Sequence, residues 1–358
     1  METVRFALIG YGKVAHLHAK AIQEANGAQL VAVCGRNKTR RDEFANKYNI
    51  SSRDTIQEAV TYDHVDAVVI STPHPQHKEN TIEAFDAGVH VLVEKPMAMN
   101  TSECTDMIVA AEKAQKVLSV VSQRRWTPSA MRMREAIDSG KLGTVALGQV
   151  TILGWRDEAY YNSDPWRGKW DTEGGGILIN QAPHQLDLLH WFLGPVERIY
   201  GEFENINHPY IEVEDSAVAV IRFKNGALAS LLLSNSQKPG IYAKVHIHGT
   251  SGASVGVQTD GGAMFVAGVS KTTDPPVNDI WNIEGEEELL SHFRDQDTAF
   301  FNSIDADSYF FTRQIEDVVR AIVTNCPPLV TGEDGRETVK IIEGIYKSGR
   351  EINPVSFS

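Results

Sequence analysis

The chain has 358 residues, enough for two domains, because a domain usually contains about 100–200 residues. It carries 34 Lys and Arg against 47 Asp and Glu, a net charge of −13, which disfavours nucleic acid as a main partner. The 42% hydrophobic content excludes a disordered or fibrous chain. No apolar run approaches the roughly 18 residues that cross a bilayer, and three scattered cysteines indicate neither a disulfide framework nor a zinc site. We therefore expect a cytoplasmic globular protein with no metal and no membrane partner.

The first 122 residues alternate between short apolar runs and helical patterns, which predicts parallel βαβ units in a doubly wound sheet. We therefore predict a Rossmann dinucleotide-binding domain over residues 1–122. Strands are expected at Val4–Ile9, Gln29–Cys34, Val65–Ser71, His90–Val93 and Val117–Val121. Helices are expected at Val14–Ala25, Arg40–Tyr48, Pro75–Ala87 and Thr101–Gln115.

Residues 123–358 predict a different architecture, an α+β domain with a large, mostly antiparallel open sheet. The dipeptide Asn225-Gly226 between two apolar runs is a strong hairpin signal. Strands are expected at Val145–Leu153, Ile199–Phe203, Ala217–Phe223, Ala227–Asn235 and Lys244–Gly249. Helices are expected at Pro128–Ser139, Asn180–Phe192, Phe310–Thr324 and Gly335–Ser348, and the stretch 270–305 gives no clear pattern.

A glycine-rich turn follows the first strand and begins the first helix. The segment reads Gly10-Tyr11-Gly12-Lys13-Val14-Ala15 and fits the pattern G-x-G-x-x-A of dinucleotide-binding turns. The first glycine allows a tight turn, the second lets the backbone approach a pyrophosphate, and the helix N-terminus attracts the anion. We assign cofactor contacts to this turn.

The end of the second strand indicates which nicotinamide cofactor is bound. NAD-specific domains have an acid there, which binds the ribose diol. Here the position holds Gly35 followed by Arg36, and the first carboxylate is Asp42. A small residue followed by an arginine suits a 2′-phosphate, so the sequence favours NADP over NAD, with Arg36 as the discriminating contact.

Two further motifs give the chain a family resemblance. Glu94-Lys95-Pro96 follows a strand, and Gly174-Gly175-Gly176 begins a segment that continues through Asn180 to His184. Together with the Gly10 turn and the run Ser71-Thr72-Pro73…His77, they resemble the Gfo/Idh/MocA oxidoreductases, from about Arg5 to Arg350. The resemblance implies a Rossmann domain joined to an α/β domain whose open sheet forms subunit contacts. It also implies redox chemistry at a hydroxyl of a sugar, an inositol or a similar polyol.

The resemblance also implies roles for individual residues. Lys95 would lie beside the nicotinamide and the reacting hydroxyl, and His184 would accept the hydroxyl proton. The family often carries Asp at the place of Asn180; an asparagine cannot accept a proton but can orient the hydroxyl with its amide. Asn180 and His184 are four residues apart, which predicts that both lie on one face of a helix. Further cofactor contacts are expected at Ser71, Thr72, Pro73, His77 and Glu94.

An aromatic and basic stretch leads from Trp155 to Trp170, directly before the triple glycine. Aromatic faces with interspersed arginines suit a sugar ring, and we assign substrate contacts to Arg156, Tyr160 and Trp166. The triple glycine is expected to let the backbone pass near the cofactor. Asp187 is interpreted as a supporting residue, and His190 as a structural one.

The sequence thus predicts a nicotinamide-dependent dehydrogenase acting on a sugar-like polyol. Two alternatives stay open: a redox-assisted glycosidase with a tightly bound cofactor, and a non-catalytic nucleotide-binding regulator. Consecutive apolar residues such as Leu231-Leu232-Leu233 predict a second-domain sheet with both faces covered. We therefore expect a homo-oligomer, either a dimer or a tetramer.

Overall fold

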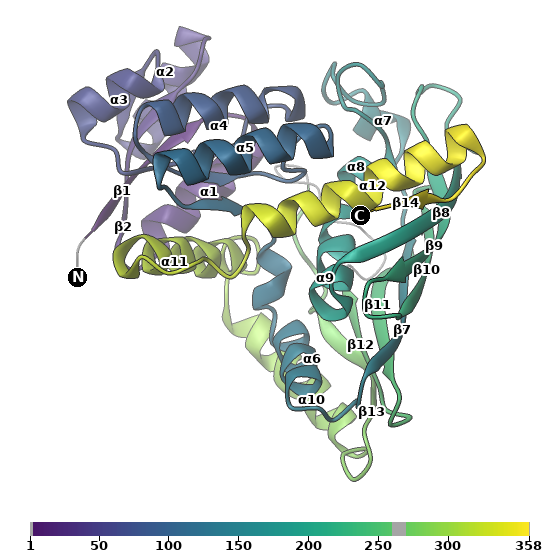
Figure 1. Cartoon of the computed structure of the whole chain (residues 1–358). Coiled ribbons are helices and arrows are strands. Elements are labelled where there is room, and N and C mark those ends of the chain that lie inside the picture. Colours follow the sequence, from purple (N-terminus) through teal and green to yellow (C-terminus); the bar gives the residue numbers. More distant parts are fainter. Residues whose placement is uncertain (1–2, 260–269, 358) are drawn as a thin grey trace. The chain divides into compact units, whose positions relative to one another are not determined.

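The computed structural model describes residues 3–259 and 270–357 (Figure 1). They form two compact units. Unit 1 contains the chain up to Gln123 together with Asp307–Arg336, and unit 2 contains most of the remainder, including Glu337–Ser358. The sequence-based division into 1–122 and 123–358 assigned the helix near residue 315 to the second part, whereas its packing puts it in unit 1. Within the described ranges, no helix combines the length and the apolar character needed to cross a membrane.

Unit 1 is built on a parallel sheet of six described strands in the order β3-β2-β1-β4-β5-β6. This is the order of doubly wound dinucleotide-binding sheets, so the predicted fold of this part is confirmed. Strand β3 was not predicted, because it has only three residues and all are half-buried. The strands are β1 (Val4–Ile9), β2 (Ala28–Cys34), β3 (Ser51–Arg53), β4 (Ala67–Ile70), β5 (His90–Val93) and β6 (Leu118–Val120).

Helices on the parallel sheet complete unit 1 (Figure 1). They are α1 (Lys13–Glu24), α2 (Lys38–Tyr48), α3 (Ile56–Asp63), α4 (His77–Asp86), α5 (Thr101–Ala114) and α11 (Tyr309–Thr324). Side chains cap several of their N-termini: Asn37 accepts a bond from the Arg40 amide, and Asn100 from the Glu103 amide. Helix α11 packs on α1, where Ile315 and Val318 are completely buried. A segment from near the C-terminus thereby joins the N-terminal core.

Unit 2 contains a mixed sheet, eight strands of which are described, in the order β13-β12-β11-β7-β10-β9-β8-β14. Adjacent strands of this described part pair antiparallel, except β7 and β10, which are parallel. The predicted large, mostly antiparallel sheet is therefore confirmed. The strands are β7 (Val145–Leu153), β8 (Val196–Glu204), β9 (Ser216–Phe223), β10 (Leu228–Ser234), β11 (Tyr242–Gly249), β12 (Ser254–Thr259), β13 (Val277–Asn282) and β14 (Val355–Ser356).

Helices cover one face of this sheet and leave the other face open (Figure 1). Along β9 and β10 buried and exposed residues alternate, as expected for a sheet with one covered face. The covered face and its helices form one apolar core around Leu186, Leu189 and Ile247. The helices are α6 (Pro128–Asp138), α7 (Glu158–Tyr161), α8 (Ile177–Asn180), α9 (Pro183–Leu193) and α10 (Leu289–Ser303), with α12 (Gly332–Glu351) running from one unit into the other.

The single helix predicted over Asn180–Phe192 is wrong: the structure has two, α8 and α9. Pro183 is the first residue of α9, and proline lacks the amide hydrogen that would continue the bonding of α8. Asn180 is therefore the last residue of α8, and His184 lies in the first turn of α9. Their spacing of four no longer places them on one helical face.

Candidate functional site

The turn between β1 and α1 uses its two glycines differently. Gly10 has a φ of +102°, and a Cβ atom there would lie 2.9 Å from the Ser71 carbonyl oxygen. Gly12 precedes α1 with a φ of −73°, and a Cβ atom on it would meet no heavy atom of the described chain within 4 Å. Among the described residues no side chain caps the helix, whose first turn begins with Lys13 and Val14. Open space beside an uncapped helix N-terminus fits a pyrophosphate.

The end of β2 carries an aromatic ring and basic side chains. The Tyr11 ring lies against Gly35, where a Cβ atom would be 2.4 Å from Tyr11 Cε1. The Arg40 guanidinium is 5.5 Å from the centre of that ring, and Arg36 is exposed. The first acid after the strand, Asp42, is hydrogen-bonded to a lysine of its own helix. A nucleotide bound at this edge would therefore meet cationic groups in place of an acid.

The residues after β4 belong to a network that holds two turns together. Ser71 is buried and donates from Oγ to the carbonyl at the end of β1, at 3.2 Å. His77 is fully buried, with Nδ1 2.8 Å from the Pro96 carbonyl oxygen and Nε2 2.9 Å from that of Thr72. Because both ring nitrogens face the protein backbone, His77 joins the two turns, and the predicted direct contact to the cofactor is corrected. Thr72 is half-buried and Pro73 exposed, so both stay accessible to a ligand.

Lys95 follows β5 in a turn that is fixed by the preceding glutamate. Glu94 is buried; its Oε1 is 2.8 Å from His18 Nε2, and its Oε2 accepts the Lys95 amide at 3.0 Å. Burial acts to raise the pKa of Glu94, but His18 and Lys95 outweigh it and lower the pKa. Lys95 itself is half-buried, and its bond to Pro96 is cis. Both Glu94 oxygens are bonded within unit 1, so the carboxylate positions the turn, and the cofactor contact of Glu94 stays a prediction.

The loop between β7 and α8 stacks two arginines on aromatic rings. The Arg167 guanidinium lies 4.4 Å from the ring centres of both Tyr160 and Trp166, and its Nη1 donates to the Tyr160 hydroxyl at 2.6 Å. Arg156 is buried 5.0 Å from the Tyr160 ring, and Gln181 Nε2 donates to the same hydroxyl at 3.2 Å. Burial raises the pKa of Tyr160, although both arginines oppose it. The three predicted substrate residues thus form one cluster, with Arg167 and Gln181 as members that the sequence did not single out.

Asn180 is bonded to a buried acid that the sequence reasoning missed. Its side-chain amide donates to Glu173 Oε1. Glu173 is only 1% exposed, and its Oε2 accepts the Gly168 amide at 2.6 Å. Asn180 is half-buried, at the C-terminal end of α8. The amide nitrogen of Asn180 is thereby turned toward Glu173.

His184 is half-buried in the first turn of α9, one turn before a buried ion pair. Arg125 donates two hydrogen bonds to Asp187, at 2.8 and 2.7 Å, and His190 Nε2 is 3.4 Å from the same carboxylate. Burial opposes ionisation, but Arg125 and His190 together lower the pKa of Asp187. Asp187 and His190 therefore support the helix that carries His184. Lys95 belongs to unit 1, whereas Asn180 and His184 belong to unit 2.

Protein atoms fill the space beside the triple glycine. A Cβ atom on Gly175 would lie 1.9 Å from the Tyr346 hydroxyl, and one on Gly176 would lie 1.7 Å from the Glu214 carbonyl oxygen. The Glu214 carboxylate accepts the amides of Gly176 and Leu178, at 2.9 and 3.0 Å, and the Tyr346 hydroxyl at 2.8 Å. Burial raises the pKa of Glu214 to about 7. Gly175 and Gly176 are therefore required for packing inside unit 2. This packing explains the two glycines without the expected approach of the backbone to a cofactor.

The two histidines of β11 have partners in the sheet. His246 Nε2 is 2.9 Å from Asp279, and His248 Nδ1 is 2.8 Å from the Ser254 hydroxyl. Across residues 3–259 and 270–357, no group of three or more His, Cys, Asp or Glu side chains is arranged to hold a metal ion.

Comparisons with known proteins find matches to the sequences of both units. The family described as "Oxidoreductase family, NAD-binding Rossmann fold" matches residues 4–122, and the "GFO/IDH/MocA C-terminal domain" matches residues 130–255. The chain is 26% identical to the myo-inositol 2-dehydrogenase of Thermotoga maritima, over 97% of both chains. It is 29% identical to the 1,5-anhydro-D-fructose reductase of Ensifer adhaerens, over 80% of this chain and 82% of that one. The WlbA dehydrogenase of Bordetella pertussis, solved with NADH and UDP-GlcNAcA, has a TM-score of 0.86 at 27% identity, covering 100% of this chain and 98% of that one. With both domains matched and the site motifs in place, this chain belongs to the Gfo/Idh/MocA family of NAD-binding oxidoreductases.

Proposed function

We propose that this protein is an NAD(P)-dependent dehydrogenase that acts on a secondary alcohol of a sugar-like polyol, such as an inositol, a glycoside or an anhydro sugar. The observation that carries the proposal is the turn after β5, where the buried Glu94 carboxylate binds the Lys95 amide. Doubly wound sheets bind their ligands at the carboxyl ends of their strands, and Lys95 lies at such an end. Two relatives, named for an inositol and for an anhydro sugar, support this class of substrate.

Three side chains share the chemistry in this proposal. A dinucleotide whose pyrophosphate is bound at the Gly10 turn would supply its nicotinamide as the hydride acceptor. His184 takes the hydroxyl proton, a role that suits an imidazole because its ordinary pKa is close to neutral pH. Lys95 donates a hydrogen bond to the reacting oxygen and stabilises the negative charge that develops on it. Asn180 orients the hydroxyl.

We further propose that NADP is the preferred cofactor. Residues 35–41 contain no acid, so a ribose diol finds no carboxylate at the end of β2. Arg36 is exposed there, and Arg40 lies over the Tyr11 ring. A 2′-phosphate would be stabilised by these cations, since a guanidinium forms charge-assisted hydrogen bonds to phosphate oxygens.

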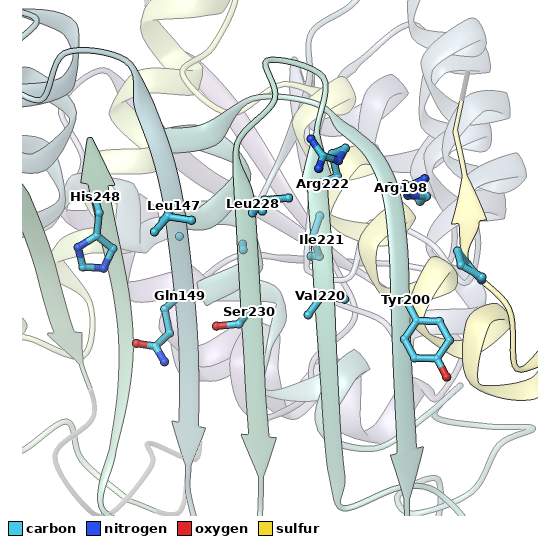
Figure 2. A pocket seen from close by; sticks show the side chains of 13 residues that line it. Leu147, Gln149, Arg198, Tyr200, Val220, Ile221, Arg222, Leu228, Ser230 and His248 are labelled. Carbon is cyan, nitrogen blue, oxygen red and sulfur yellow. The ribbon is translucent and has the colours of Figure 1, made fainter. Parts of the chain in front are cut away.

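We also propose that the protein assembles through the open face of its mixed sheet. Figure 2 shows this face over neighbouring strands, where Leu147, Val220, Leu228 and Tyr200 lie beside Arg198 and Arg222. Val220 is 58% exposed and Leu147 51% exposed, which is unusual for apolar side chains in the middle of a sheet. A second copy on this face would bury them in a dimer or tetramer. Light scattering at micromolar concentration tests this, and a monomer would contradict it.

The decisive experiment is a turnover assay with NAD and NADP on myo-inositol, methyl glucoside and a 1,5-anhydro sugar. Net formation of reduced nicotinamide supports the proposal, whereas glycoside cleavage without it indicates a redox-assisted glycosidase. Lys95→Ala should lower kcat by about 10²–10⁴ and leave dinucleotide binding intact. Lys113→Ala, which changes an exposed lysine of α5, is the matched control. Near-full turnover in Lys95→Ala would refute the role of Lys95.

A second variant tests the proton acceptor. If His184 takes the hydroxyl proton, the oxidation rate should rise with pH over the titration range of an imidazole. His184→Ala should remove that rise and slow turnover by about 10²–10⁴. Persistence of the same rise with good turnover in His184→Ala would assign proton transfer to Lys95 or to water.

A further inference from the structure

We infer that Glu173 is a positioning residue that fixes which atom of the Asn180 side chain faces the reacting hydroxyl, and that requires residue 180 to be uncharged. The catalytic part of this inference rests on the proposed function. The pairing of the two side chains does not, because both belong to unit 2 and the hydrogen bond is made within it.

The environment of Glu173 fixes its carboxylate in place. The side chain is 1% exposed, and its Oε2 accepts the Gly168 amide at 2.6 Å. Gly168 has a φ of +72°, and a Cβ atom there would lie 2.7 Å from the Ile211 side chain, so this turn is itself closely packed. The Glu173 amide in turn donates to the Lys169 carbonyl at 3.0 Å. The carboxylate is therefore anchored at one oxygen and presents the other to Asn180.

The chemistry of the pair determines the orientation of the Asn180 amide. An ionised carboxylate only accepts hydrogen bonds, so the nitrogen of Asn180 must face Glu173. The amide group is planar, and its oxygen lies on the other branch. Asn180 would then meet the substrate hydroxyl with an acceptor. This revises the expectation that the amide donor of Asn180 orients the hydroxyl.

Both Glu173 oxygens accept hydrogen bonds from nitrogen donors, which is the pattern of a carboxylate. The negative charge of Glu173 acts to raise the pKa of Tyr160, Tyr161 and Tyr346. Arg156 and Arg167 act on Tyr160 in the opposite direction, so the acid shares its surroundings with two cations. Two further acids of this region are buried: Glu214 accepts the Tyr346 hydroxyl, and Asp215 is bonded to His208.

An aspartate at position 180 is therefore incompatible with Glu173, although relatives in this family often carry one. Asn180→Asp would bring two carboxylates within hydrogen-bonding distance, and one of them would have to take up a proton. The free-energy cost of keeping one of the two groups protonated grows with pH. Glu173→Gln relieves it, because the glutamine amide can donate to the new aspartate. The protein should therefore tolerate Asn180→Asp only when Glu173→Gln is made at the same time.

The primary test is a double-mutant cycle measured by thermal unfolding at pH 6 and pH 8. We compare the wild type, Asn180→Asp, Glu173→Gln and the double variant. Asp171→Asn, which removes an exposed carboxylate from the same loop, is the matched control. Asn180→Asp should lower Tm by about 5 °C at pH 8 and by less at pH 6, and the double variant should recover at least half of the loss. The inference would be overturned if Asn180→Asp lowered Tm by the same amount with and without Glu173→Gln. It would also be overturned if Asn180→Asp and the double variant both failed to fold.

The second test measures turnover of myo-inositol and methyl glucoside. Glu173→Gln should lower kcat about tenfold with little change in KM, because the Gly168 amide holds the glutamine oxygen and the glutamine nitrogen then faces Asn180, which turns the Asn180 amide the other way. The double variant, with a carboxylate oxygen as acceptor, should return to within about threefold of the wild-type kcat. Unchanged kcat in Glu173→Gln would refute the positioning role. If the wild type converts neither probe, the proposed function fails, while the unfolding cycle still decides the pairing.

Discussion

Two glycine-rich turns of this chain resemble each other in sequence but differ in what occupies the space beside them. Both precede a helix, the first at Gly10–Gly12 before α1 and the second at Gly174–Gly176 before α8. A Cβ atom on Gly12 would meet no heavy atom of the described chain within 4 Å, whereas one on Gly176 would lie 1.7 Å from the Glu214 carbonyl oxygen. The first turn leaves space for a ligand, and the second is filled by its own protein.

The N-termini of the two helices differ in the same way. In unit 2 the Glu214 carboxylate accepts the amides of Gly176 and Leu178, so α8 begins on an anion supplied by the protein. In unit 1 the described residues supply no side-chain cap to α1. A helix N-terminus attracts negative charge in both cases, and the source of that charge is what distinguishes a binding turn from a structural one.

The largest expected effect comes from a substitution in the turn at Gly174–Gly176, which we call the structural turn; the turn at Gly10–Gly12 is the binding turn. Gly176→Ala should destabilise unit 2 by more than about 4 kcal/mol, because the new methyl group overlaps a backbone oxygen that cannot move alone. Urea unfolding measures the loss. Gly226→Ala is the control, since Gly226 has a φ of +90° with open space around it and should lose only about 1 kcal/mol. Similar losses in both variants would show that the packing is looser than described.

The next effect concerns the acid of the structural turn. Burial raises the pKa of Glu214 from 4.5 to about 7, so the folded protein binds more protons than the unfolded chain between these values. The contribution of Glu214 to the free energy of unfolding is therefore fully present below about pH 4.5. It falls by about 3 kcal/mol as the pH rises to about 7.

The measurement is the free energy of unfolding from pH 5 to pH 8 in the wild type and in Glu214→Gln. The variant should show a flatter dependence on pH, and Glu212→Gln, at an exposed neighbour, should follow the wild type. Identical slopes in the wild type and Glu214→Gln would contradict the raised pKa.

A smaller effect separates the binding turn from the structural one. Gly12→Ala should leave Tm within about 2 °C of the wild type, because its φ of −73° suits alanine and the site is open. Dinucleotide affinity should fall about 10- to 100-fold, since the methyl group occupies space next to the pyrophosphate. Titration calorimetry measures the affinity. Gly10→Ala should lose both stability and affinity, and retained affinity in Gly12→Ala would place the pyrophosphate elsewhere.

The smallest effect tests cofactor choice at the same end of unit 1. Arg36→Ala should weaken NADP binding by about 1–2 kcal/mol more than NAD binding, the value of a charge-assisted contact to phosphate. Dissociation constants for both cofactors give the difference. Arg5→Ala, at the start of β1, should leave the ratio unchanged. Equal losses in Arg36→Ala would indicate a contact to a part that both cofactors share.

Much of the fold followed from the periodicity of apolar residues. The bounds of β1, β5 and β7 agree with the sequence prediction to the residue: β1 and β5 are short, mostly apolar runs, and β7 is a longer strand of nine residues. Helix α10 was missed because it fully buries only Asp297 and Phe301, while Leu290 and Phe293 are partly buried, so its apolar face is weak. The break between α8 and α9 could have been found, since Pro183 signals a new helix start.

The site was predictable where one short motif carries it, as at Gly12 and Lys95. The supporting acids were not, because their partners are distant: Glu214 is 38 residues from Gly176, and Glu94 is 76 residues from His18. A signal did exist for His18, which lies on the buried face of α1 between alanines and therefore needs a buried partner. Glu173 had no such signal, since it lies in an irregular loop.

Helix α11 follows most of unit 2 in the sequence but packs in unit 1. The core of unit 1 is therefore completed only after most of unit 2 has been synthesised. The last strand of the parallel sheet is hydrogen-bonded by Gln314, which donates to the Val120 carbonyl at 2.7 Å and accepts the Ser122 amide 192 residues earlier. Ile315 and Val318 then cover the apolar surface of α1. While unit 2 is being translated, the first 123 residues must wait with this surface uncovered. The nascent chain therefore keeps this apolar surface exposed until residues 309–324 have left the ribosome, and exposed apolar surface of this kind favours aggregation.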